Sequence, residues 1–264
     1  MVVSLYRLSG EGRRRSGLKR FLTFAAASVG ATIELALFPS RCKVCRAWLE
    51  SPGSKAVCGA CLSALTPAAD PFCPCCGAFF DGAGEPHYCG SCLDAPPPFL
   101  RHRSFGRYRG ALRDVILLYK FRGYAVLGRV LAEKSFSALD RDEGLWWGEP
   151  ILVPVPLHPK REKERGFNQS ALLARELARR SGLGIEGKVL VRTRNAPPQS
   201  TLEAAARARN VRGVFAVKRP ERVRGRAVIL VDDVYTTGAT LKECAGTLLR
   251  AGAAEVRGIT LARA

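Results

Sequence analysis

The sequence predicts an α/β protein in which helices flank a parallel sheet and a small cysteine-rich domain precedes it. After residue 99, short apolar runs of strand length alternate with amphipathic runs of helix length, a pattern that favours a parallel sheet covered on both faces. Nine of the ten cysteines lie between residues 42 and 92, and the proline-rich stretch DAPPPF follows them. We therefore expect a basic and apolar lead-in helix at 1–38, a cysteine domain at 39–98 and an α/β domain at 99–264.

The composition indicates a folded and strongly basic protein. The 264 residues are 47% hydrophobic, which is enough for a sizeable core and argues against wholesale disorder. The 42 Lys and Arg residues against 23 Asp and Glu residues give a net charge of +19, which predicts attraction to phosphate-rich partners or anionic lipid. Ten of these cations lie between residues 192 and 226 against two glutamates, so we expect a basic face there.

The first 38 residues carry a basic run followed by the apolar stretch up to Phe38. This order resembles an export signal, with Arg14 and Arg15 as a twin-arginine pair. Glu34 interrupts the apolar stretch, and no clean small-residue cleavage site precedes a polar start. We therefore favour an amphipathic helix that contacts the core or a membrane surface, with export or a membrane span as the alternative.

The cysteines form a repeat in which two C-x-x-C pairs are separated by twelve residues, and the whole pattern recurs 31 residues later. Each pair places two sulfurs on one side of a tight turn, and two such turns complete the tetrahedron of thiolates that Zn²⁺ prefers. Disulfides would not require this regular pairing. The expected structural zinc ligands are Cys42, Cys45, Cys58 and Cys61 in the first ribbon and Cys73, Cys76, Cys89 and Cys92 in the second. Cys75 and His87 remain alternative ligands because they lie beside this second set.

The remaining elements follow from periodicity, prolines and glycines. The pattern predicts helices from residue 109, at 125–139, at 167–181 and at about 240–250, and strands at 151–156, 187–192, 226–231 and 255–262. A proline-stiffened loop is expected after the strand at 151–156. Cys244 falls within an apolar helical pattern, so we expect a core residue there.

The stretch VILVDDVYTTGATL at 228–241 carries the chemistry of a binding site. It follows a buried strand with Asp232 and Asp233, whose carboxylates can accept hydrogen bonds from vicinal sugar hydroxyls. The hydroxyls and backbone N–H groups of Thr236, Thr237, Gly238, Ala239 and Thr240 come next, at the start of a helix, where they can surround one phosphate. A pair of acids beside an anion site suits a ribose 5-phosphate better than a bare polyphosphate.

This stretch resembles the phosphoribosyl-pyrophosphate (PRPP) binding motif of the type I phosphoribosyltransferases. Together with the tandem four-cysteine ribbons, KFRG, VPVPLHPKREKERGFNQ and PPQSTLEAAARARNVRGVF, it is similar to the ComF family of competence proteins from about residue 37 onward. The resemblance implies a type I phosphoribosyltransferase-like sheet behind a double zinc ribbon. It also implies PRPP with Mg²⁺ as the ligand, in addition to the structural Zn²⁺.

By the resemblance, each part of the motif has a role. Asp232 and Asp233 match the ribose-binding acids, and Thr236 to Thr240 match the 5-phosphate loop. Lys160 and Arg161 would lie at the pyrophosphate and, with the acids, would be the catalytic residues of an active enzyme, while Arg165 joins the PRPP ligands. The segment Gln199 to Asn210 corresponds to the flexible loop of catalytic relatives, with Arg207 and Arg209 suited to neutralising pyrophosphate.

The resemblance implies a cytoplasmic protein of natural transformation that binds PRPP and single-stranded DNA during DNA uptake. Its expected partners include an uptake helicase or a recombination-loading protein, with peripheral contact at the inner face of the membrane. The alternative is an active phosphoribosyltransferase that transfers ribose 5-phosphate to a base or amine. The sequence shows no hood after the motif to hold such an acceptor; residues 99–150 or the ribbons could supply one, with Tyr119, Trp146 or Trp147 stacking on a base.

Overall fold

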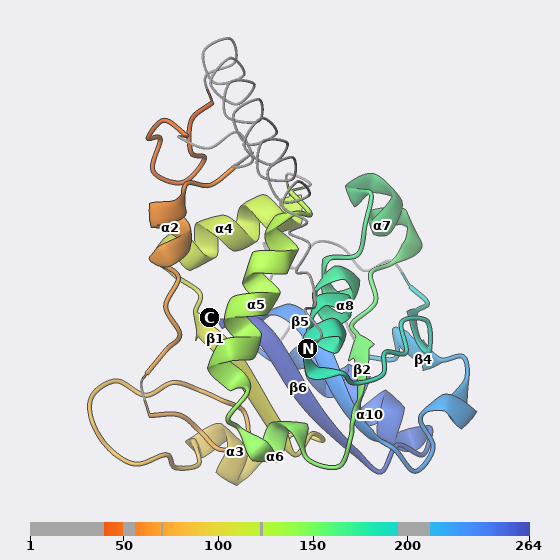
Figure 1. Ribbon diagram of the computed structural model, residues 1–264. Helices are drawn as coiled ribbons and strands as arrows, with labels where there is room; N and C mark the ends of the chain where they lie inside the picture. Colours follow the sequence, from red (N-terminus) through yellow and green to blue (C-terminus); the bar gives the residue numbers. More distant parts are fainter. Residues whose placement is uncertain (1–39, 50–55, 70, 122–123, 195–211) are drawn as a thin grey trace, which may run out of the picture. The chain divides into compact units, whose positions relative to one another are not determined.

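The computed structural model describes residues 40–49, 56–69, 71–121, 124–194 and 212–264 (Figure 1). These residues fall into two units that divide between Leu62 and Ser63. The expected lead-in helix at 1–38 and the expected flexible loop at 199–210, with Arg207 and Arg209, lie outside the described residues. Within the described part of the chain, the helices are too short or too polar to cross a membrane.

The second unit contains the parallel sheet that the sequence predicts. Its four strands lie in the order β1-β6-β5-β2, and every neighbouring pair is parallel. The strands are β1 (Arg101–Arg107), β2 (Ile151–Pro154), β5 (Ala227–Tyr235) and β6 (Glu255–Arg263). β6 is buried except at its two end residues, and β5 is buried from Val228 to Val231 and at alternate residues after that, as expected for a sheet covered on both faces.

Helices cover both faces of this sheet. The long helices are α4 (Gly110–Phe121), α5 (Leu127–Leu139), α8 (Gln169–Ser181) and α10 (Ala239–Arg250). Figure 1 shows α5 and α8 in front of the sheet and α10 behind it. The α10 residues Cys244 and Leu248 are fully buried against alternate residues of the strands, such as Val228 and Leu230. Cys244 is therefore the small core residue that the helical pattern predicts.

Shorter elements complete the described chain. They are α2 (Gly59–Ser63), α3 (Gly90–Asp94), α6 (Glu143–Trp146), α7 (Pro159–Arg165), the 3-10 helix Pro220–Arg222, β3 (Leu190–Arg192) and β4 (Phe215–Val217). The sequence predicts a loop after the strand at 151–156, whereas the structure forms the helix α7 there. Pro159 fixes the first turn of that helix, His158 accepts a hydrogen bond from the Lys160 N–H, and Gly166 ends the helix in a left-handed conformation.

The edge strand β1 is absent from the sequence prediction because RHRSFGR lacks a run of branched apolar residues. Its inner residues are nevertheless buried, since their polar groups have partners. The Nε2 atom of His102 lies 3.1 Å from Thr260 Oγ1, and Ser104 Oγ lies 2.7 Å from the same hydroxyl. Burial lowers the pKa of His102 to about 3, so the ring is neutral in the folded protein.

The strand predicted at 187–192 does not join the parallel sheet. β3 pairs antiparallel with β4 in a separate two-stranded sheet. The segment before it touches the main sheet at the single parallel bridge between Leu152 and Ile185, and the backbone then turns away. The three-residue β4, which the sequence analysis does not anticipate, supplies the hydrogen-bonding partner instead.

Candidate functional site

Two aspartates lie within β5, near its carboxyl end. The strand continues past them to Tyr235, because β6 keeps pairing with it as far as Arg263. The expectation that β5 ends at Val231, directly before the acids, is therefore wrong. The parallel pairing still brings this part of β5 to the edge of the sheet at which β2 leads into α7 and β5 leads into α10.

Both carboxylates are held by neighbouring side chains. Lys120 Nζ lies 2.9 Å from Asp233 Oδ1, and Gln169 Nε2 donates to Asp233 Oδ2 at 2.8 Å. Ser170 Oγ donates to Asp232 Oδ1 at 2.9 Å. Asp233 is only 3% exposed, whereas Asp232 is half-buried. The pair is thus oriented by contacts from α4 and α8, with Asp232 more open to solvent.

The start of α8 is placed at this edge by its own cap. The Asn168 side chain accepts hydrogen bonds from the N–H groups of Ser170 and Ala171, and its Nδ2 atom donates to the carbonyl of Val155 just after β2. One asparagine therefore fixes the helix start to the end of the strand. This contact puts Gln169 and Ser170 beside the aspartates.

The electrostatics of the pair are unequal. Burial, with the charge of Asp233 next to it, raises the pKa of Asp232 to about 7, although Lys120 opposes this. Burial alone would lower the pKa of Lys120, but the charge and hydrogen bond of Asp233 outweigh it and raise the pKa. The ammonium group is thus a stable counterion to Asp233, and Asp232 is the carboxylate that can change its protonation near neutral pH.

Residues Thr236 to Thr240, which form the loop after β5 and the start of α10, line a small hollow of about 20 Å³. Gly238 has φ +74°, and a Cβ atom there would lie 2.0 Å from the Tyr235 hydroxyl oxygen, so only glycine fits. The N–H groups of the first turn of α10 begin at this glycine, which offers no side-chain cap. The loop and helix start together present the donors that an anion such as phosphate needs.

Cationic side chains gather near the same edge. Lys160 and Arg161 lie in the first turn of α7, where Lys160 is exposed and Arg161 is half-buried. Arg165, at the end of α7, donates to Gln169 Oε1 at 2.6 Å. Burial lowers the pKa of the Arg165 guanidinium, an effect that the charge of Asp233 opposes.

Arg192 in β3, which the sequence does not mark as a site residue, lies close enough to Arg161 and Asp232 to feel their charges. Burial and the charge of Arg161 lower its pKa, while the charge of Asp232 opposes this. Lys120 and Ser170 are further residues that sequence reasoning missed. Lys120 lies inside the KFRG stretch that carries the family resemblance, and Ser170 directly follows the GFNQ stretch, so these motifs are the signal that could have marked them.

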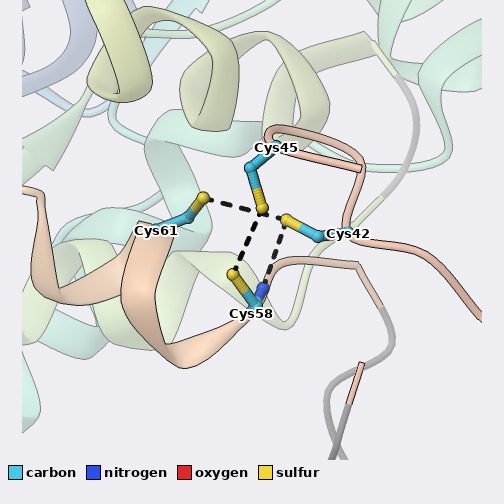
Figure 2. Close-up of side chains that lie close together, drawn as sticks. All are labelled: Cys42, Cys45, Cys58 and Cys61. Carbon is cyan, nitrogen blue, oxygen red and sulfur yellow. Dashed lines mark hydrogen bonds between the residues drawn. The ribbon is translucent and has the colours of Figure 1, made fainter. Parts of the chain in front are cut away.

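The structure brings the predicted cysteines together as two sets of four. In the first set, shown in Figure 2, the Sγ atoms of Cys42 and Cys61 lie 3.9 Å apart and those of Cys45 and Cys58 lie 3.6 Å apart. A zinc–sulfur bond length of about 2.3 Å gives a tetrahedron with edges of about 3.8 Å, whereas a disulfide needs about 2.05 Å. The spacing therefore fits Zn²⁺ and excludes disulfides in these two sets.

The second set has the same geometry, with 3.6 Å between the Sγ atoms of Cys76 and Cys89. The two alternative ligands lie outside it. Cys75 is buried with its Sγ atom 3.9 Å from the carbonyl oxygen of Phe99. His87 is exposed and stacks on Phe80, with 4.0 Å between the ring centroids. The second set is thus Cys73, Cys76, Cys89 and Cys92.

The second ribbon is part of the core of the α/β domain, and Arg263 joins it to the phosphate-type loop. The guanidinium group of Arg263 donates to the carbonyl oxygen of Cys76 at 2.7 Å and lies 3.6 Å from the Cys76 sulfur. It also lies 4.2 Å from the centroid of the Tyr235 ring, whose hydroxyl abuts Gly238. A continuous set of contacts therefore runs from a zinc ligand to the loop.

A larger cavity of about 590 Å³ lies elsewhere in the second unit, beside the start of β1. Arg101 and Arg103 in its wall both bind Asp142, at 2.5 and 2.6 Å. Because β1 runs parallel to the other strands, its first residues lie at the amino end of the sheet, away from the carboxyl ends that carry the loop. This cavity therefore cannot serve as a hood over the aspartates.

The residues considered for base stacking are placed differently from one another. Tyr119 is fully buried and donates to the carbonyl of Gln169 at 2.7 Å. Trp146 donates to the carbonyl of Leu139 at 2.7 Å and packs edge-on against Phe136. Trp147 is 76% exposed. Tyr119 and Trp146 are thus packing residues, and Trp147 alone of the three is open to solvent.

Comparisons with known proteins agree with this arrangement. A family model described as a double zinc ribbon domain matches residues 34–93, and one described as a phosphoribosyl transferase domain matches residues 164–264. The parallel sheet, its loop and the cysteine sets therefore define a phosphoribosyltransferase-like protein with a double zinc ribbon.

Three relatives identify the family within this class of protein. DNA utilization protein YhgH of Salmonella typhimurium is 38% identical over 166 residues, which cover 61% of this chain and 71% of that protein. Competence protein F of Haemophilus influenzae is 35% identical over 164 residues, covering 60% and 71%. Competence protein ComFC of Bacillus subtilis is 36% identical over 167 residues, covering 62% and 64%. The chain belongs to the ComF family of competence proteins.

The raised pKa of Asp232 predicts an unusual dependence of stability on pH. The folded state keeps the proton up to about pH 7, whereas the unfolded chain releases it near the ordinary value of 3.8. The free energy of unfolding should therefore fall as the pH rises from about 4 to about 7 and level off above that, relative to Asp232→Asn. Urea unfolding of both proteins, with zinc content checked at each pH, measures this difference. Parallel curves would contradict the assignment.

The contacts of Arg263 predict that the two zinc sites differ in importance for the α/β domain. Cys76→Ser should lower the midpoint of thermal unfolding of that domain by about 5 °C or more, because the metal and a buried contact are lost together. Cys45→Ser, the equivalent change in the first ribbon, should leave that midpoint near the wild-type value. Calorimetry separates the two, and equal losses would be inconsistent with the contacts described.

Proposed function

We propose that this protein binds PRPP, or a closely related phosphoribosyl ligand, and takes part in DNA uptake during natural transformation. The proposal rests on one observation: two oriented aspartates and the segment Thr236 to Thr240, whose N–H groups can bind an anion, lie together at the carboxyl end of β5. A ribose 5-phosphate has the matching features, with vicinal hydroxyls on the ring and a phosphate at the 5-position. No other described part of the chain combines these features.

Each part of the ligand has a counterpart in the site. Asp232 and Asp233 accept hydrogen bonds from the ribose hydroxyls, and Lys120 lowers the cost of placing two acids together. Residues Thr236 to Thr240 surround the 5-phosphate at the start of α10. Lys160, Arg161 and Arg165 face the pyrophosphate. Since side chains already bind both aspartates, Mg²⁺ fits best as an ion that arrives on the oxygens of the ligand itself.

The DNA role draws on the relatives and on charge. The related proteins are named for DNA utilization and competence, and this chain has a net charge of +19. A surface of that charge attracts single-stranded DNA, and the binding should weaken steeply with salt. An uptake helicase or a recombination-loading protein is the expected protein partner. The proposed location is the cytoplasm, at the inner face of the membrane.

A second candidate function is phosphoribosyl transfer itself. The cations around Arg161 and Arg192 favour it, because they could stabilise pyrophosphate as the anomeric bond breaks. In that reaction Asp232, Asp233, Lys160 and Arg161 would be the catalytic residues. The test is pyrophosphate release from PRPP across a panel of bases and amines. Release that depends on the acceptor would establish catalysis, and none across the panel would leave binding as the function.

The ligand assignment predicts the effect of neutralising both acids. The double variant Asp232→Asn, Asp233→Asn should bind PRPP with Mg²⁺ about 100-fold more weakly, since each acid loses a charge-assisted hydrogen bond. Isothermal titration of the zinc-loaded full chain measures this. Asp81→Asn, which changes an exposed carboxylate that pairs with Arg107 and does not belong to residues 232–241, is the control and should bind like the wild type. Unchanged affinity in the double variant would remove the central inference.

A further inference from the structure

The two ribbons are structural repeats of each other, residue by residue. Adding 31 to a residue number in the first ribbon gives its equivalent in the second. The isolated bridge between Arg41 and Trp48 recurs between Phe72 and Phe79. The hydrogen bond from the Arg46 N–H to the Cys42 carbonyl recurs from the Gly77 N–H to the Cys73 carbonyl, at 2.9 and 2.8 Å. Equivalent positions can therefore be compared directly.

The turn of the second ribbon is packed tightly against the α/β domain. Gly77 has φ +65°, and a Cβ atom there would lie 2.6 Å from the His102 carbonyl oxygen of β1. The guanidinium group of Arg103 lies 4.5 Å from the centroid of the Phe72 ring, and that of Arg107 lies 5.5 Å from the Phe79 ring. The aromatic pair of this turn is thus used for packing within the domain.

The equivalent turn of the first ribbon has different residues and an exposed surface. Arg46 occupies the position of Gly77 and has the same left-handed backbone, with φ +70°. An arginine is less stable than a glycine in this conformation, because its Cβ atom crowds the backbone, so the positive charge at this position comes with a loss of stability. Trp48, at the position of Phe79, is 56% exposed, and the Arg41 guanidinium lies 4.3 Å from the centroid of its ring.

The charge around this tryptophan is positive. Arg41, Lys43 and Arg46 are all exposed, and the sequence of residues 40–62 contains four Lys and Arg residues against one acid, Glu50. A zinc ion with four thiolates carries two net negative charges, which the net charge of +3 on these side chains exceeds. A flat aromatic ring with cations around it is the arrangement on which single-stranded nucleic acids stack their bases, with the cations contacting the phosphates.

We infer that the turn of the first ribbon is a stacking platform for single-stranded DNA, in which a base packs on Trp48 and Arg41, Lys43 and Arg46 contact the flanking phosphates. The inference rests on the proposed DNA role and gives that role a surface. Every base has a π-face, so binding at this platform is tolerant of sequence. The second ribbon lacks the platform because its aromatic pair is already packed.

The experiment measures binding of a labelled 20-residue oligothymidine to the zinc-loaded full chain by fluorescence anisotropy, at several salt concentrations. Trp48→Ala should weaken binding about tenfold, and Trp48→Phe should retain most of the affinity because a ring remains. Arg46→Gly should weaken binding about threefold and reduce the salt slope by about 0.7, without loss of thermal stability. Trp147→Ala is the control, since that side chain is 76% exposed in the other unit, and should bind like the wild type.

The outcomes separate this inference from the proposed function. Selective weakening in the Trp48→Ala and Arg46→Gly variants, with zinc content unchanged, supports the platform. If the wild type binds the oligonucleotide tightly and in a salt-dependent way, and all variants bind it equally well, the platform is overturned and the DNA role is kept. If Trp48→Ala loses zinc, the Arg46→Gly variant still tests the platform. It removes one positive charge, and glycine favours the left-handed backbone at that position, so the fold is kept. A wild-type protein that does not bind the oligonucleotide overturns both.

Discussion

The contacts of the Arg263 guanidinium group hold together the second ribbon, the last strand and the loop after β5 in the second unit. This group bonds to the carbonyl of a zinc ligand, Cys76, and lies over the ring of Tyr235. The Tyr235 hydroxyl in turn occupies the space that a side chain at Gly238 would need. The metal site, the last strand and the phosphate-type loop are therefore packed as one body. A structural zinc site can thus support the loop between β5 and α10, although it does not itself line that loop.

Much of this fold could be predicted from sequence, because its strong signals are local. Cysteine spacing marks both metal sites, and the motif in β5 marks the loop. The parts that escaped depend on distant partners. Strand β1 has no apolar run and is held by the bonds of His102 to Thr260. Lys120 reaches Asp233 from 113 residues away, and no local pattern reports such a pairing.

The repeat shows how one structural unit can serve two roles. Both ribbons keep the same cysteines and backbone hydrogen bonds, which the metal requires. The two ribbons differ at positions that do not bind the metal. Gly77 and Phe79 of the second ribbon are packed, whereas the equivalent Arg46 and Trp48 of the first ribbon are exposed. The proposed ligand site at β5 and the exposed turn of the first ribbon therefore differ in chemistry. In the proposed function, the site at β5 binds a phosphoribosyl group and the exposed turn of the first ribbon binds DNA.

Amide hydrogen exchange with and without PRPP and Mg²⁺ tests the central claim most directly, because it locates the ligand on the backbone. Ligand binding should protect the amides of residues 232–241, which form the acid pair, the loop and the start of α10. Ribose 5-phosphate should protect the same peptide, and the lining of the 590 Å³ cavity near residues 138–144 should be unchanged. Protection at that cavity, or none at 232–241, would contradict the assignment of the phosphoribosyl site.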